Sequence, residues 1–124
     1  MAGIRSYRDL QVWQKGMDLA VEVYRLARLM PKNEEYRLTS QIVRAAASVP
    51  ANIAEGNARG TRKDYANFIS IARGSLAETE TLLMLAVRTT LLAEAETVRA
   101  LQMADELGRQ LNTLRQRLKQ SPDP

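Results

Sequence analysis

Residues 48–56 read SVPANIAEG, which places a proline and a glycine six residues apart in a run of otherwise small and apolar residues. Apolar residues recur three or four apart on both sides of the proline, from Leu38 to Ile53. This spacing predicts a helix over about residues 36–59 that runs straight through Pro50. We expect a kink there, because proline lacks a backbone N–H and clashes with the carbonyl four residues earlier.

The same spacing predicts three further helices, over about residues 9–30, 62–90 and 93–120. The first should stop before Pro31, because the residue ahead of a proline disfavours the helical conformation. The third should start at a motif like a capping box, formed by Thr61 and Asp64. Four amphipathic helices of similar length with short connections predict one all-α domain over residues 1–124, an up-down-up-down four-helix bundle.

Two of these helices carry more apolar residues than one face needs. The expected buried stripe of the first helix is Leu10, Trp13, Met17, Ala20, Tyr24 and Ala27, and that of the third is Tyr65, Phe68, Ala72, Leu76, Leu83 and Ala86. Off these stripes lie Leu19, Val23 and Leu26 in the first helix and Ile71, Leu82 and Leu85 in the third. A second apolar face usually meets a partner, so we expect a homo-oligomer; a wide core is the alternative.

Composition excludes several kinds of site. Cysteine and histidine are both absent, which removes disulfides, thiolate or imidazole metal sites and Cys/His nucleophiles or bases. We therefore expect no cofactor, no metal and no catalytic residues. No apolar run is long enough to span a membrane, and the first residues lack the apolar core of a signal peptide, so the sequence predicts no membrane association and a cytoplasmic location.

Polar residues in the middle of the second and third helices predict an internal network. Asn52 and Glu55 share one helix face, and the expected partners on the third helix are Arg73, Ser75 and Glu78. Gly56 and Gly74 would let the two helices approach closely. A ligand site facing solvent is one alternative. A catalytic site built on the carboxylates of Glu55 and Glu78 is the other.

Cations gather in two places in this basic chain, whose net charge is +4. Arg59, Arg62 and Lys63 lie at the turn before the third helix, where the free N–H groups of the helix start also favour a phosphate. The second cluster, near the end of the fourth helix, is Arg109, Arg115, Arg117 and Lys119. The sequence carries no base-reading motif, so any nucleic-acid binding should be directed at the backbone and sensitive to salt. Solvated helix ends are the other interpretation of both clusters.

Two long stretches of the sequence resemble a known family. They are residues 9–27, DLQVWQKGMDLAVEVYRLA, and residues 39–86, TSQIVRAAASVPANIAEGNARGTRKDYANFISIARGSLAETETLLMLA. Both resemble the four-helix-bundle proteins encoded in intervening sequences of bacterial 23S ribosomal RNA genes, also labelled S23 proteins. The resemblance implies a bundle that assembles into a homopentamer. It extends to the accessory protein of diversity-generating retroelements, which associates with a reverse transcriptase and with nucleic acid.

The expected partners are therefore further copies of the chain, and RNA or a reverse transcriptase or other ribonucleoprotein. The alternative is a protein-interaction adaptor, whose arginines meet an acidic protein surface without direct contact to nucleic acid.

Overall fold

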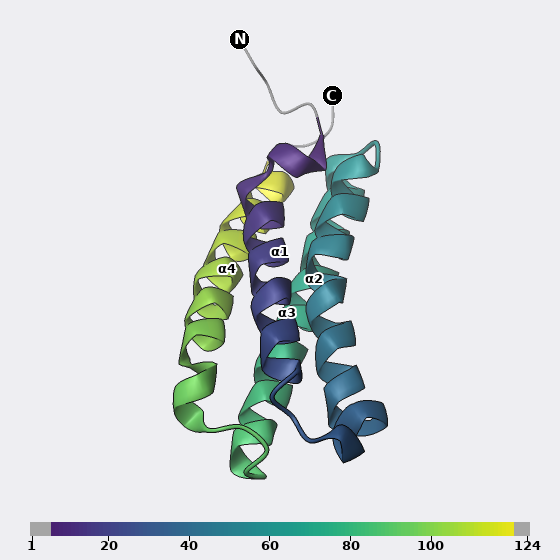
Figure 1. Ribbon diagram of the computed structural model, residues 1–124. Helices are drawn as coiled ribbons and strands as arrows, with labels where there is room; N and C mark the ends of the chain where they lie inside the picture. The colour runs from purple at the N-terminus through teal and green to yellow at the C-terminus, as the bar shows by residue number, and fades with distance from the viewer. Residues whose placement is uncertain (1–5, 121–124) are drawn as a thin grey trace.

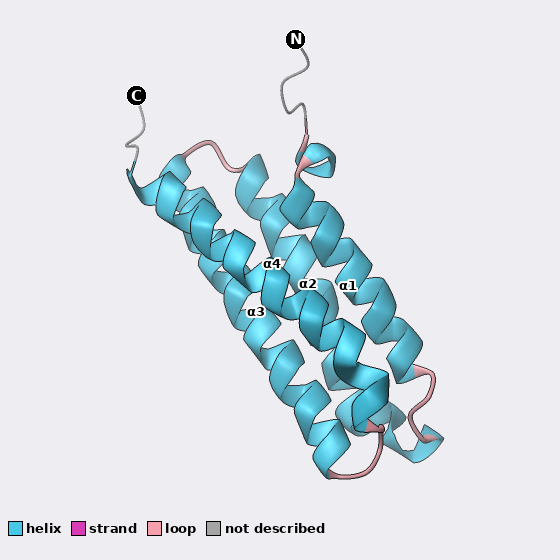
Figure 2. Cartoon of the chain, turned by 90° about the vertical axis from the view of Figure 1, so that its left-hand side faces the viewer, coloured by secondary structure: helices cyan, strands magenta, loops and turns pink. Residues whose placement is uncertain are grey.

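The computed structural model describes residues 6–120, which form a bundle of four long helices. These are α1 (Gln11–Ala27), α2 (Ser40–Ala58), α3 (Arg62–Arg88) and α4 (Glu94–Gln120). The helices run alternately down and up, so that the start of α1, the α2–α3 turn and the end of α4 lie together at one end of the bundle (Figures 1 and 2). Residues 6–120 contain no strand. The prediction of an all-α four-helix bundle is confirmed.

The helix ends follow local signals. Thr61 caps α3, because its Oγ1 accepts a hydrogen bond of 3.1 Å from the backbone N–H of Asp64. A short 3₁₀ turn, Tyr7–Asp9, comes before α1 and is capped in the same way by Ser6. No helix among residues 6–120 is long and apolar enough to cross a membrane.

The connection between α1 and α2 differs from the prediction. Helix α1 ends at Ala27, three residues before the expected end, and a turn leads into Pro31. A 3₁₀ turn (Lys32–Glu34) and a single π-helical turn (Glu35–Thr39) then lead into α2. The backbone leaves helical geometry at Arg37, with φ −117° and ψ −111°, so α2 begins about four residues later than expected. Helix α2 continues through Pro50, and the kink expected there stays a prediction.

The core of α1 uses more of its surface than the expected stripe: Ala20 of that stripe is buried, and Leu10 and Trp13 pack against the core. Leu19, Val23 and Leu26 are almost fully buried, whereas Met17 and Tyr24 of the expected stripe are 40% and 47% exposed. The prediction was wrong for Met17 and Tyr24, because both stripes have helical spacing, and spacing alone does not say which face meets the other helices. On α3 the expected stripe lies in or against the core except for Phe68, which is half-buried, and of the residues off the stripe Ile71 and Leu85 are exposed.

The two glycines expected to allow close packing behave differently. A Cβ on Gly56 would lie 2.6 Å from the Cβ of Phe68 on α3, so only glycine fits at this contact between α2 and α3. Gly74 is exposed, and a Cβ there would have no neighbour within 4 Å. The prediction is confirmed for Gly56 and wrong for Gly74, which is on the solvent side of α3.

Candidate nucleic-acid interface

The first basic cluster surrounds the short turn between α2 and α3. Arg59 is the C-cap of α2, and its guanidinium pairs with Glu55 at 2.7 Å and lies over the ring of Phe68 at 4.8 Å. Arg62 and Lys63 occupy the first turn of α3. The turn therefore holds Arg59 in place by an ion pair and a cation–π contact, and leaves Lys63 exposed to solvent.

The second basic cluster lies beside the first. The Nη2 of Arg62 donates a hydrogen bond of 3.4 Å to the backbone carbonyl of Arg117, 55 residues later in the sequence. This contact joins the first turn of α3 to the last turns of α4, at the end of the bundle where α1 begins and α4 ends (Figure 1). The tertiary structure thus brings together two clusters that are widely separated in the sequence.

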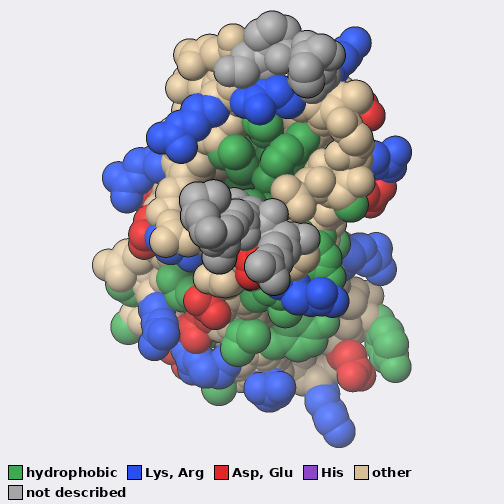
Figure 3. Space-filling view, turned by 90° about the horizontal axis from the view of Figure 1, so that it is seen from above, with side chains coloured by type: hydrophobic (Ala, Val, Ile, Leu, Met, Phe, Trp, Pro, Cys, Tyr) green, Lys and Arg blue, Asp and Glu red, His purple; other side chains and the backbone are tan. Residues whose placement is uncertain are grey.

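The cations of α4 are engaged to different degrees. Arg115 donates from Nε to the hydroxyl of Ser70 on α3 at 2.5 Å, and Arg109 pairs with Asp105 at 3.3 Å. Within residues 6–120, the side chains of Arg117 and Lys119 are exposed and form no ion pair. Seen from above, Lys and Arg side chains lie around the rim of the molecule, with apolar side chains and some Asp and Glu side chains between them (Figure 3).

Side-chain charge decides the electrostatics here, because the helix dipoles oppose one another. The basic end contains the starts of α1 and α3, which carry partial positive charge, and the ends of α2 and α4, which carry partial negative charge. These contributions largely cancel. The attraction for an anion therefore depends on the guanidinium and ammonium groups, chiefly Lys63, Arg117 and Lys119.

The internal polar network is smaller than expected: it keeps Asn52 and Ser75 of the predicted members and adds Ser48. The hydroxyls of Ser48 on α2 and Ser75 on α3 lie 2.7 Å apart, and Asn52 donates to the carbonyl and hydroxyl of Ser48 at 2.8 and 2.9 Å. Glu55, Arg73 and Glu78 are exposed and take no part in it. The prediction was wrong for these three because α2 and α3 meet along Ser48 and Ser75, which turns the longer charged side chains toward solvent.

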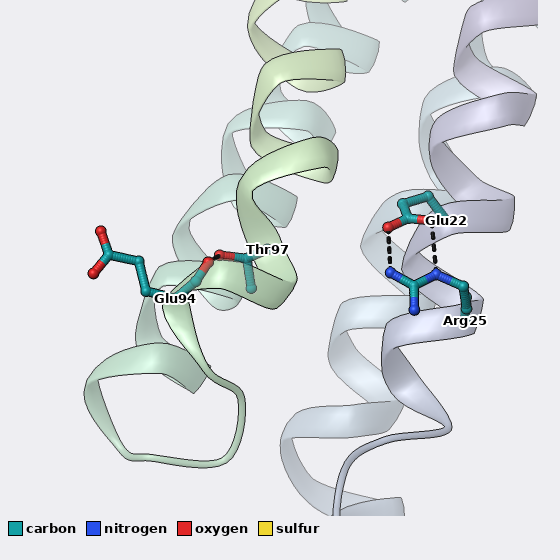
Figure 4. Close-up of polar contacts among 4 residues, drawn as sticks. All are labelled: Glu22, Arg25, Glu94 and Thr97. Atoms are coloured by element: carbon teal, nitrogen blue, oxygen red, sulfur yellow. Dashed lines mark hydrogen bonds and ion pairs between the residues drawn. The ribbon is translucent and has the colours of Figure 1, made fainter.

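Two polar contacts near the other end of the bundle were not predicted (Figure 4). Arg25 donates from Nε and Nη2 to the two carboxylate oxygens of Glu22, at 2.9 and 2.7 Å, and Glu22 is buried. On α4 the hydroxyl of the buried Thr97 donates to the carbonyl of Glu94 at 2.9 Å. The three-residue spacing of Glu22 and Arg25 was a usable signal for their pairing. In the described part of the chain, no group of three or more acidic, His or Cys side chains could hold a metal ion.

Comparison with known proteins agrees with the fold and with the resemblance in the sequence. No curated protein matches the chain. A crystal structure of a protein of unknown function from the S23 ribosomal protein family of Bacteroides thetaiotaomicron is similar, with 27% sequence identity and a TM-score of 0.77. The match covers 83% of this chain and 96% of that one. The model of the 23S rRNA-intervening sequence protein family matches residues 8–113. The chain therefore belongs to the 23S rRNA-intervening sequence protein family.

Proposed function

We propose that this protein is a non-enzymatic, cytoplasmic RNA-binding bundle that works as a homo-oligomer and contacts RNA backbones with its basic end. The observation that carries the proposal is the contact between Arg62 and the carbonyl of Arg117, which unites the two basic clusters on one surface. Lys63, Arg117 and Lys119 supply the exposed charge. Ammonium and guanidinium groups bind phosphate oxygens without reading bases, so this surface suits a sequence-independent contact.

The oligomer is supported by apolar surface outside the core. We define the α1/α2 apolar surface as Met17, Val21, Tyr24, Ala47 and Pro50, which line a groove of about 380 Å³ together with Ala20 and Arg28. Val21 is 66% exposed. On α3, Ile71 and Leu85 are also exposed, at 50% and 44%.

Exposed apolar residues on two different faces of the bundle suit a head-to-tail contact, which forms a closed ring when the rotation between subunits closes and an open filament when it does not. The family resemblance favours a ring of five subunits. In a ring whose axis follows the helices, the basic ends lie side by side and their potentials add.

The proposal assigns no catalysis. The sequence has neither cysteine nor histidine, and the carboxylates considered for catalysis, Glu55 and Glu78, are exposed. Glu55 is also paired with Arg59 at 2.7 Å.

A charge-reversal experiment tests the RNA proposal. The double variant Lys63→Glu/Lys119→Glu changes the basic end, and Lys32→Glu/Arg88→Glu makes the same change in net charge at the opposite end of the bundle. Fluorescence anisotropy with a labelled structured RNA should show micromolar binding by the wild type that weakens with salt. The first variant should lose most of this affinity and the second should keep it, because phosphate contacts dominate such binding.

Two results would contradict the proposal. Equal losses in both variants would mean that net charge alone attracts RNA. No salt-dependent binding by the wild type would favour the adaptor alternative, in which a protein partner stays bound after nuclease treatment.

A further inference from the structure

The α1/α2 apolar surface continues beyond the residues that define it. Its groove of about 380 Å³ is followed, toward the connection between α1 and α2, by a second one of about 520 Å³, and Tyr24 and Arg28 line both. The two form one elongated depression beside α1, the α1/α2 groove. Beyond Arg28 its lining includes Met30, Pro31 and Tyr36. Within residues 6–120, Arg28 forms no ion pair. The groove therefore has largely apolar walls on either side of an unpaired guanidinium.

The outward face of α2 is apolar as well. Ala47, Ala51, Ala54 and Ala58 follow one another at intervals of four, three and four residues, so they share one face of the helix. Ala54 is half-buried and the other three are exposed, whereas the opposite face of α2 lies in the core. A helix that is apolar on all sides is normally buried. We therefore expect another helix to cover the alanine face, where short side chains allow a close approach.

Helix α3 carries a line of residues with the pattern that such a groove requires. Ile71, Glu78 and Leu85 are each seven residues apart, which places them along one line of the helix, and all three are exposed. We call them the α3 ridge. Within the described part of the chain, the carboxylate of Glu78 forms no ion pair. The ridge therefore offers two apolar side chains with an unpaired anion between them, which complements the unpaired cation between the apolar walls of the groove.

Groove and ridge have the same spacing along the bundle. Helices α1 and α3 both begin at the basic end and run in the same direction (Figure 1). At a rise of about 1.5 Å per residue, Val21 lies about 15 Å and Arg28 about 25 Å from the start of α1. Ile71 lies about 14 Å and Glu78 about 24 Å from the start of α3. Two subunits that stand side by side in the same orientation thus have these apolar residues at one level and the two unpaired charges at another. Leu85 then reaches the part of the groove beyond Arg28.

We propose that the α3 ridge of one subunit packs in the α1/α2 groove of the next, where its Glu78 pairs with Arg28. This inference rests on the homo-oligomer proposed above and names the two surfaces that meet in it. A groove needs a convex partner, so a two-fold contact of groove against groove leaves the depression unfilled and Glu78 unpaired. Groove and ridge lie on different faces of the bundle, so the contact is head-to-tail. The apolar contacts supply the affinity, whereas the charge pair selects the register.

The test mixes two variants that each lose one side of the contact. Val21→Asp damages the groove and Ile71→Asp damages the ridge, so light scattering should show that each alone is monomeric while the wild type is an oligomer. An equimolar mixture should contain heterodimers of about twice the monomer mass and nothing larger, because only the intact ridge of the first variant can enter the intact groove of the second. Masses are taken at several protein concentrations, since one contact without ring closure is weaker.

Ala77→Asp is the matched control. It puts the same charge at an exposed position of α3 that lies about 100° around the helix from Glu78, and it should keep the wild-type mass. Circular dichroism checks that every variant is folded.

A second experiment tests the charge pair. Arg28→Glu and Glu78→Arg each place like charges opposite one another, and each should raise the concentration at which the oligomer dissociates about tenfold. The combination Arg28→Glu/Glu78→Arg restores an opposite pair at every contact and should return this concentration to near the wild-type value. General repulsion between subunits would instead make the two single variants act in opposite directions, because they change the net charge in opposite directions.

Three results would overturn the proposal: an Ile71→Asp variant with the wild-type mass, a mixture of the two Asp variants that stays monomeric, or a double charge variant that dissociates as readily as its parents. If Val21→Asp is monomeric while Ile71→Asp is not, the oligomer proposed above stands with a different surface in the groove. A monomeric wild type removes the oligomer and the ridge contact together, and leaves RNA binding to the charge-reversal experiment.

Discussion

At the scale of single residues, the Glu22–Arg25 pair makes stability depend on pH. The hydrogen bonds from Arg25 hold the pKa of the Glu22 carboxyl below its ordinary value of 4.5, with the charges of Arg25 and Arg99 adding to this effect and burial opposing it. A carboxyl whose pKa is lowered by folding stabilises the fold above its unfolded pKa and loses this effect as pH falls through the folded pKa.

We therefore predict that Glu22→Gln is less stable than the wild type at pH 7, and that the difference shrinks below about pH 4.5. Urea unfolding followed by circular dichroism, at pH 7 and at the lower pH and at one protein concentration, measures this difference in the free energy of unfolding. Glu78→Gln, at an exposed carboxylate, is the control. A constant difference between Glu22→Gln and the wild type across this range would contradict the prediction.

Thr90 carries backbone strain at the end of α3. Its φ of 64° is the only positive value at a non-glycine residue within residues 6–120. The N–H groups of Thr90 and Leu91 bond the carbonyls of Val87 and Ala86, a Schellman motif whose left-handed position usually holds glycine. Thr90→Gly should therefore raise the free energy of unfolding by up to about 1 kcal/mol. A Cβ in the left-handed conformation costs about 1–2 kcal/mol, and the greater conformational entropy of glycine in the unfolded chain offsets part of the gain from removing it. Thr90→Ala keeps the Cβ and should give no gain in the same denaturant titration.

At the scale of helices, Gly56 and Gly74 form a natural pair for comparison. Gly56→Ala would drive a Cβ to within 2.6 Å of Phe68 and 3.2 Å of the Tyr65 ring. The overpacking should lower the free energy of unfolding by about 1–3 kcal/mol, which exceeds the gain in helix propensity. Gly74→Ala meets nothing within 4 Å and should be more stable than the wild type by up to about 1 kcal/mol. Two changes of the same sign would show that helix propensity, not packing between α2 and α3, decides the outcome.

At the scale of the whole molecule, the α1/α2 apolar surface should hold the subunits together. Val21→Asp puts a charge on this surface at a side chain that is 66% exposed, and should turn an oligomer into monomers, because a buried unpaired carboxylate is strongly unfavourable. Light scattering gives the solution mass, and circular dichroism checks that the helices remain. Gln102→Asp makes the same change in charge at an exposed position of α4 and should leave the mass unchanged. A wild type that is already monomeric would exclude this role for the surface.

The features predicted most accurately from the sequence are those that depend on local interactions along the chain. The helical class followed from apolar spacing. The start of α3 at Arg62 followed from Thr61, and its end was predicted within two residues of the observed end at Arg88. The boundary between α1 and α2 was less accurate, because the break at Arg37 has no proline or glycine to mark it.

The sequence by itself determined that this protein is an all-helical, basic chain without thiols or imidazoles, because backbone hydrogen bonding and capping depend on residues within a few positions of one another. Only the tertiary structure decided that Leu19, Val23 and Leu26 face the core, that Glu55 faces solvent, and that Arg62 meets Arg117. These outcomes depend on packing between helices that are far apart in the sequence, which no local spacing encodes.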